Sequence, residues 1–165
     1  MNLGMETEYV EHKRSTSEMR EGMESVASIL NKHGHGTLYF GVRPSDGEVV
    51  GQDVSEKTFR DISQKVGELI EPRIYPQIER LETPEGKAYV RVEFSGFETP
   101  YACDGRYRIR RADGDIVMSR AKLAEMMRES ENRSSPWDGR SSGQPVSAVD
   151  VDVLRRYVER GVGAK

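Results

Sequence analysis

The sequence predicts an α+β protein with one folded domain at residues 1–130, a polar linker at 131–148 and a C-terminal helix within 149–165. Three observations lead to this prediction. The 165 residues are 35% hydrophobic and 32% charged, which suits one well-packed core with an appendage. Apolar residues alternate in strand-sized runs and elsewhere recur at helical spacing. The segment 131–148 lacks periodic apolar side chains, so burial does not offset the entropy cost of ordering it.

In the first half of the domain, the sequence predicts a strand, a helix and a hairpin. Residues 9–14 form a short strand, and a helix follows at 18–32 with Ser17 as its N-cap. The glycine-containing run after this helix ends it with a turn. Residues 37–51 are predicted to form a β-hairpin, because the Pro-Ser-Asp-Gly turn at 44–47 separates two apolar runs.

In the middle of the domain, the sequence predicts a second helix and two paired strands. The helix is capped by Asp53 or Ser55, carries an apolar face and ends before Pro72, which cannot continue a helix. Residues 74–81 and 87–94 alternate as two antiparallel strands around a Thr-Pro-Glu-Gly turn.

Toward the end of the chain, the sequence predicts two helices separated by the linker. Ser119 caps the first of them, which runs to about Arg128. Its side chains expected to face inward are Leu123, Met126 and Met127. Trp137 predicts a docking point in the linker, because a large ring in a polar segment usually contacts another surface. The helix at 149–160 is too short to be stable alone, so we expect it to pack on the core or in a homodimer. The short tail after it suggests a piece of a longer protein.

The segment Gly-Arg-Tyr-Arg-Ile-Arg-Arg at 105–111 is the most informative motif. As a strand with a period of two, it places three cations on one face, namely Arg106, Arg108 and Arg110. Such residues lie about 6.6 Å apart, close to the spacing of successive phosphates along a nucleic-acid strand. The net charge of the chain is -3, so this basicity is local. The alternative is that these arginines only balance nearby acids, which are Asp104, Asp113 and Asp115.

Several cations are candidates for phosphate contacts. They are Lys13, Arg14, Arg43, Arg73, Arg106, Arg108, Arg110 and Arg111. Three tyrosines could stack on bases, namely Tyr39, Tyr101 and Tyr107, and for Tyr39 and Tyr107 the alternative is that they fill the core. The sequence shows no recognition helix, so we expect binding to DNA or RNA that is driven by shape and charge and depends strongly on salt.

A second constellation lies near the N-terminus. Glu11 and Lys13 share one face of the first strand, and Glu6 joins them only if it precedes the strand or the chain bends. Converging carboxylates bind Mg²⁺ or Mn²⁺, and a nearby lysine can steady a phosphate or an attacking water. The alternative is a solvated edge of the domain.

Other classes of protein and site are excluded or disfavoured. The apolar runs are far shorter than the roughly 20 residues that span a bilayer. The lone Cys103 cannot form an internal disulfide, so we expect a cytoplasmic protein. The spacing of Gly36 and Gly41 is that of a phosphate loop, but the required Lys and Ser or Thr do not follow. His33 and His35 lack a third metal ligand nearby and are expected to lie in an exposed turn.

The order of several motifs resembles the Schlafen AlbA-like domain family over roughly residues 6–127. The motifs are Glu-x-x-x-x-Glu-x-Lys at 6–13, Asn-x-x-Gly-x-Gly at 31–36, Leu-Tyr-Phe-Gly-Val at 38–42, Val-Val-Gly at 49–51 and Pro-Tyr-x-x-x-Gly-Arg-Tyr-x-Ile-Arg-Arg at 100–111, followed by Met-Ser at 118–119. The resemblance implies a curved, mixed or antiparallel β-sheet with two to three helices packed against it. It also implies a module that binds DNA or RNA, at the N-terminus of a larger bacterial-type transcriptional or defence regulator.

The resemblance also implies an alternative function. Some members are metal-dependent endoribonucleases that cut structured RNA such as tRNA. Their acidic site corresponds here to Glu6 and Glu11, with Lys13 alongside, and it would hold Mg²⁺ or Mn²⁺. The third family acid is replaced by Arg-Pro-Ser at 43–45, and Asp46 is the nearest candidate. A further alternative is a module of proteins described as ATP-binding, or a module for protein interaction.

Overall fold

The structure is a computed structural model that describes residues 1–112, 114–134, 147 and 150–162. It divides into two compact units, Met1–Glu131 and Asn132–Lys165. The elements in chain order are β1 (Val10–Lys13), the 3₁₀ helix η1 (Thr16–Glu18), α1 (Met19–His33), β2 (His35–Phe40), α2 (Glu56–Leu69), β3 (Ile70–Glu71), β4 (Gln77–Glu82), β5 (Ala88–Ser95), β6 (Ala102–Cys103), β7 (Arg106–Arg111), β8 (Gly114–Val117), α3 (Arg120–Ser134) and α4 (Val151–Val162).

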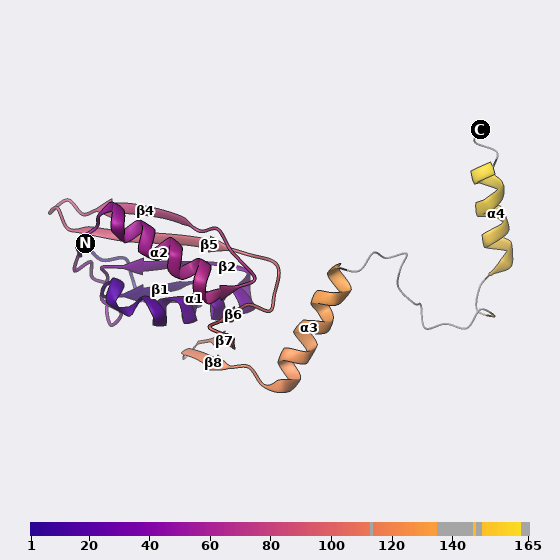
Figure 1. Ribbon diagram of the computed structural model, residues 1–165, viewed down its shortest axis with the longest axis horizontal. Coiled ribbons are helices and arrows are strands. Elements are labelled where there is room, and N and C mark those ends of the chain that lie inside the picture. The colour runs from indigo at the N-terminus through magenta and orange to yellow at the C-terminus, as the bar shows by residue number, and fades with distance from the viewer. Residues whose placement is uncertain (113, 135–146, 148–149, 163–165) are drawn as a thin grey trace. The chain divides into compact units, whose positions relative to one another are not determined.

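The first unit contains two sheets, and the predicted α+β class is confirmed. The larger sheet has the order β1-β2-β5-β4, and its strands run side by side in Figure 1. Strand β1 pairs with β2 in parallel, whereas β2, β5 and β4 pair antiparallel, so this sheet is mixed. The smaller sheet is antiparallel and has the order β3-β6-β7-β8.

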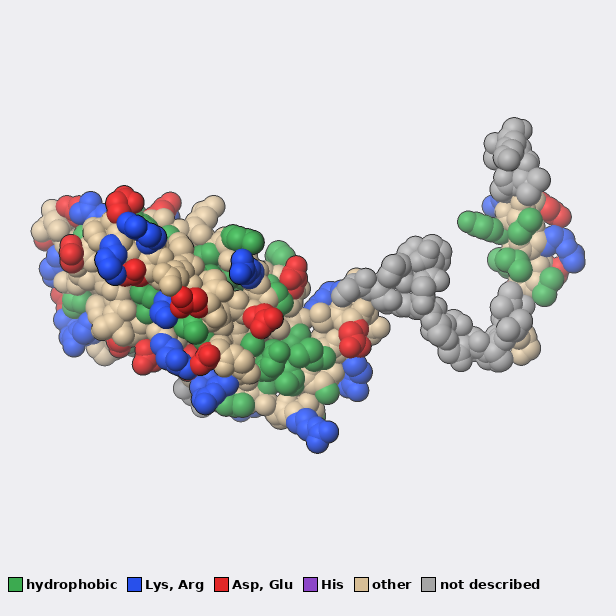
Figure 2. Space-filling model, viewed as in Figure 1, with side chains coloured by type: hydrophobic (Ala, Val, Ile, Leu, Met, Phe, Trp, Pro, Cys, Tyr) green, Lys and Arg blue, Asp and Glu red, His purple; other side chains and the backbone are tan. Residues whose placement is uncertain are grey.

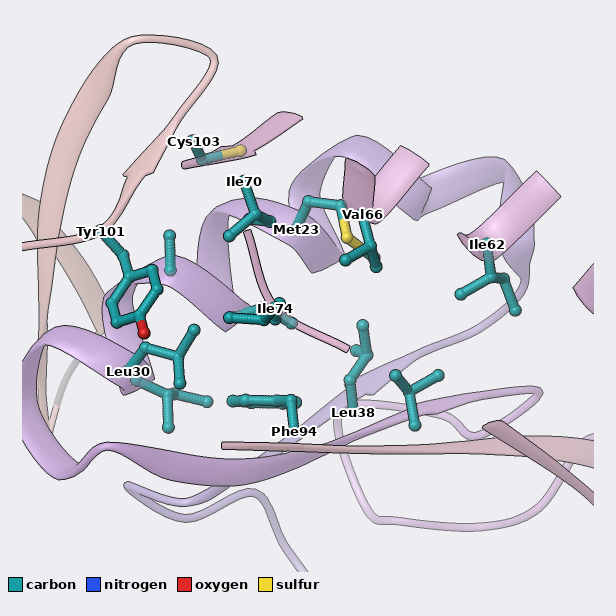
Figure 3. Close-up of a cluster of buried hydrophobic side chains, with 14 of the residues drawn as sticks. Met23, Leu30, Leu38, Ile62, Val66, Ile70, Ile74, Phe94, Tyr101 and Cys103 are labelled. Atoms are coloured by element: carbon teal, nitrogen blue, oxygen red, sulfur yellow. The ribbon is translucent and has the colours of Figure 1, made fainter. Parts of the chain in front are cut away.

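Helices α1 and α2 cover one face of the larger sheet, and the core lies between these helices and the sheet. Alternation along β2 and β5 buries Leu38 and Phe94 on this face, where they meet Met23 of α1 and Ile62 of α2 (Figure 3). A Cβ at Gly22 would lie 3.0 Å from the side chain of Leu38, so a larger residue would push α1 away from β2.

The start of α1 differs from its prediction. Ser17 was expected to cap the helix, but its backbone N–H donates to Ser15 Oγ, which begins the one-turn helix η1. Helix α1 follows after Glu18, whose carboxylate accepts from Arg14 N–H at 2.7 Å instead of capping α1. Its end is as predicted: Gly34 has a φ of 75° and donates to Leu30 O.

The other predicted elements are found with small changes. Ser55, not Asp53, caps α2 through a reciprocal capping box with Thr58. The hairpin at 37–51 is reduced to β2 and one bridge between Val42 and Val49. Strands β4 and β5 pair as expected. The short strands β3, β6 and β8 were not predicted.

The C-terminal elements correct two expectations. Helix α3 starts after Ser119 as predicted but continues to Ser134, so the first residues assigned to the linker are helical. Met126 is buried, whereas Met127 is 38% exposed and does not face inward. Trp137 lies outside the described residues. Helix α4 occupies the predicted position, and dimerisation through it stays a prediction. Within the described residues, no helix is long and apolar enough to span a membrane.

Candidate nucleic-acid interface

The predicted pairing of Glu11 and Lys13 on one strand face is confirmed. In β1 they stand opposite Leu38 and Phe40 of β2, so they lie on the side of the sheet that α1 covers. Lys13 Nζ lies 2.6 Å from Glu11 Oε1. His12, between them, points to the other face and is buried.

Arg110 lies inside the domain in a network of ion pairs. Its guanidinium contacts Glu11 Oε2 at 2.5 Å and Asp115 Oδ1 at 2.8 Å, and Ser25 Oγ donates to the other Asp115 oxygen at 2.7 Å. Burial alone would lower the pKa of Arg110, but its hydrogen bonds to Asp115 and Glu11 outweigh burial and raise it. The network therefore joins β1, α1, β7 and β8 around a permanently charged side chain that is 7% exposed.

The row of arginines on β7 is not open along its length. Arg108 Nη2 lies 3.2 Å from Glu24 Oε2 on α1, and Arg110 is buried, while Arg106 is exposed. The reason is that α1 packs against β7 and supplies carboxylates to this face. Asp115 does balance Arg110, as the alternative interpretation of the motif held. A phosphate would have to displace a carboxylate to reach Arg108 or Arg110.

An open cleft of about 660 Å³ adjoins this network. Its acids are Glu6, Glu8, Glu11, Glu21, Glu24 and Asp115, and its cations are Lys13, Arg108, Arg110 and Arg111. The pKa of Glu6 is raised. Burial and the charge of Glu11 raise it, and they outweigh the hydrogen bond from the N–H of His12, which lowers it. With six acids and four cations, this cleft does not favour a polyanion.

Two of the acids proposed for a metal site, Glu11 and Asp46, are paired with cations. Glu11 uses one oxygen for Lys13 and the other for Arg110. Asp46 binds Arg43 at 2.7 Å and does not line the cleft. In the described parts of the chain, no three His, Cys, Asp or Glu side chains form a group that could hold a metal ion. The catalytic roles proposed for Glu6, Glu11, Lys13 and Asp46 stay predictions, as does Mg²⁺ or Mn²⁺ at Glu6 and Glu11.

A second depression carries cations without acids. It measures about 450 Å³ and lies between β7, β8 and the start of α3; we call it the β7–β8 groove. It is lined by Lys32, Arg110, Arg111, Lys122, Ser119, Ile109, Ile116, Val117 and Met118, and these described residues include no Asp or Glu. Sequence reasoning missed Lys32 and Lys122. A usable signal for Lys122 is that the first turn of α3 contains no acid.

The other predicted contact residues are scattered. Arg14 and Arg73 are exposed, while Arg43 is held by Asp46 and Glu48. Tyr39 is partly buried beside Tyr89, whereas Tyr101 is 1% exposed and lies in the core, where it cannot stack on a base. Figure 2 shows blue and red side chains intermingled over the face of the first unit that it presents.

Because His12 is buried, we expect the free energy of unfolding to fall in acid. Its ring meets Tyr39 edge-on at 5.7 Å, and within the described residues neither ring nitrogen has a hydrogen-bond partner. Burial lowers its pKa, so the unfolded chain takes up a proton at a higher pH than the folded one. The free energy of unfolding should therefore fall as the pH drops below about 6.5.

Urea denaturation of the variant His12→Phe tests this prediction. We expect the variant to gain about 1 kcal/mol near neutral pH, because a buried unsatisfied group is removed, and to lose less stability in acid. Some acid dependence should remain, because burial also lowers the pKa of His33. The substitution of the exposed His35, His35→Phe, serves as control. If His12→Phe loses as much unfolding free energy in acid as wild type does, His12 is not the source of the acid dependence.

Comparisons with known proteins relate the first unit to a family and a fold. A family model described as Schlafen, AlbA_2 matches residues 6–119. No curated protein matches the sequence. The structure is similar to that of the DIP2311 protein from Corynebacterium diphtheriae, with a TM-score of 0.58 and 18% identity over 74% of this chain and 27% of that one. The chain thus spans about a quarter of that protein, and the likeness shows the fold.

A second similar structure is the N-terminal domain of an ATP-dependent DNA helicase RecG-related protein from Nitrosomonas europaea. Its TM-score is 0.47 and its identity 20%, over 68% of this chain and 84% of that one.

Proposed function

The chain belongs to the Schlafen AlbA_2 family, and from this premise we propose that it binds DNA or RNA through the β7–β8 groove. The observation that carries the proposal is the lining of the groove, which includes four cations and, among the described residues, no Asp or Glu. A polyanion gains most where cations converge without carboxylates that repel it. The same strand that sequence reasoning selected, β7, supplies one wall.

The cations of the groove differ in how freely they can contact phosphate. Arg111 is exposed, and the described residues offer it no ion pair. Lys32 pairs with Glu8 at 2.5 Å and Lys122 with Glu125 at 3.1 Å. Such pairs at the surface contribute only about 0–1 kcal/mol, so a phosphate can replace the carboxylate at little cost. Arg110 holds the strands in place and contacts phosphate least.

Two further features of the groove suit a nucleic acid. Ser119, which precedes α3, lines the groove, and the first turn of α3 contains no acid, so the positive end of the helix dipole lies at the groove and favours anions. Val117 is 65% exposed and Ile116 37%, and these side chains offer an apolar surface to sugars or bases. Neither feature distinguishes one base sequence from another, so we expect affinity to depend on charge and shape.

A salt-titrated binding assay with RNA and DNA tests this function. The double variant Arg111→Ala/Lys122→Ala should bind at least about tenfold more weakly, and the slope of log affinity against log salt should fall by about two. The matched control is Lys57→Ala/Arg60→Ala, which removes the same charge from the exposed face of α2. Equal weakening in both double variants would mean that only net charge matters, and the groove would lose its role.

The same assay with Mn²⁺ addresses the endoribonuclease hypothesis. Because cations engage both carboxylate oxygens of Glu11, we expect RNA to be retained and left intact. Cleavage that Glu11→Gln abolishes would show that the cleft rearranges to hold a metal ion. A position at the N-terminus of a larger bacterial-type regulator stays a proposal.

A further inference from the structure

A pocket of about 420 Å³ opens at the end of the larger sheet where β2 begins and β5 ends. Two tyrosines flank it from different parts of the chain: Tyr9 precedes β1 and Tyr75 precedes β4, and these are the edge strands of the sheet. Polar side chains at its rim are His35, Thr37, Gln77 and Glu93. We call this site the tyrosine pocket.

The rings of the tyrosine pocket are available to a ligand. Tyr75 is 87% exposed, and within the described residues it makes no hydrogen bond, ion pair or ring contact. Tyr9 is 43% exposed and is held in place by His33 and His35, whose ring centroids lie 4.1 and 5.3 Å from its own. One wall is thus fixed and the other is free to close over a flat molecule.

The tyrosine pocket is connected to the β7–β8 groove by the C-terminal end of α1. Lys32 lines the groove, and the ring of the next residue, His33, packs against Tyr9 of the pocket. Glu8 joins the two features, because one of its oxygens lies 2.5 Å from Lys32 Nζ and the other 3.3 Å from His33 Nε2. Lys32 and His33 are neighbours in the chain, so the end of α1 borders both the groove and the pocket.

We propose that the tyrosine pocket receives one unpaired base of a single-stranded nucleic acid whose backbone lies in the β7–β8 groove. This inference rests on the proposed function and adds the strandedness of the ligand. A flat heteroaromatic ring stacks on tyrosine irrespective of its identity, and the rim offers Gln77 and Glu93 to its polar edge. A base within a duplex is stacked and paired on all sides, so it does not reach the pocket unless it is flipped out.

Binding of a single strand, a matched duplex and a strand with abasic positions tests the inference. Tyr75→Ala should bind the single strand roughly tenfold more weakly, and Tyr75→Phe should bind it normally, because stacking needs the ring and not the hydroxyl. The duplex should bind wild type and Tyr75→Ala alike. Tyr157→Ala, which removes a ring of similar exposure (78%) from α4, is the matched control. A strand with 2-aminopurine should lose fluorescence on binding to wild type and keep it with Tyr75→Ala.

The outcomes separate the pocket from the groove. If Tyr75→Ala binds the single strand like wild type while Arg111→Ala/Lys122→Ala binds weakly, the pocket inference is wrong and the proposed function stands. A duplex that binds more tightly than the single strand also overturns it. If a mononucleotide binds at Tyr75 as tightly as the strand does, regardless of the groove variant, the pocket serves a small molecule instead. If wild type retains no nucleic acid, both proposals fall.

Discussion

Replacing Asn31 by alanine is expected to destabilise the protein by about 3 kcal/mol or more, since three buried backbone groups lose their partner. The Asn31 side chain donates to Tyr101 O at 2.7 Å and to Arg108 O at 2.8 Å. Its Oδ1 accepts from the N–H of Tyr101 at 2.6 Å. Asn31 is 7% exposed, so water cannot take over these bonds without opening the structure.

The consequence of this variant extends to function, because Asn31 ties the end of α1 to β7 and to the segment before β6. Chemical denaturation measures the loss of stability. Asn31→Asp should also destabilise, because a carboxylate keeps the bond to the N–H of Tyr101 but cannot donate to the two carbonyls. The exposed Asn132→Ala in α3 is the matched control and should change the free energy of unfolding by less than about 0.5 kcal/mol. A similarly small change for Asn31→Ala would contradict the role of the three bonds.

Arg110→Ala is the second substitution with a large expected effect, a loss of about 3–5 kcal/mol. Removing the guanidinium leaves the buried Glu11 and the partly buried Asp115 near each other without the cation that joins them. The double variant Arg110→Met/Glu11→Gln should recover part of this loss, because it removes one of the uncompensated charges and keeps the volume filled. Arg106→Ala, on the exposed end of the same strand, should stay within about 0.5 kcal/mol of wild type.

Thermal or urea denaturation of these variants distinguishes a structural arginine from a phosphate contact. If Arg110→Ala is as stable as Arg106→Ala but binds nucleic acid poorly, Arg110 contacts the ligand directly and the burial argument fails. If Arg110→Ala is destabilised as expected, neutralising Arg106, Arg108 and Arg110 together does not test binding, because the triple variant loses its fold before its affinity can be measured. Arg111 is the residue of β7 at which binding can be tested without this complication.

The sequence by itself predicted what depends on neighbours along the chain. Helical spacing and Gly34 determined α1 to within a residue at each end, because both the apolar period and the left-handed cap are local. Alternation alone placed Glu11 and Lys13 together in β1, and the turn at 83–86 paired β4 with β5. The N-cap of α1 was predicted wrongly because Ser15 and Ser17 can both cap a helix, and local sequence does not show that Ser15 caps a separate one-turn helix before α1.

Only the tertiary structure decided which charges are free to bind. Arg106, Arg108 and Arg110 are equivalent in a strand pattern, yet α1 packs over the last two and supplies Glu24 and Ser25 to their surroundings. The groove combines Lys32 with Lys122, and the tyrosine pocket combines Tyr9 with Tyr75. Periodicity and turn residues act over a few positions, whereas these sites join segments far apart in the chain, and burial and charge pairing there follow from the packing of the whole domain.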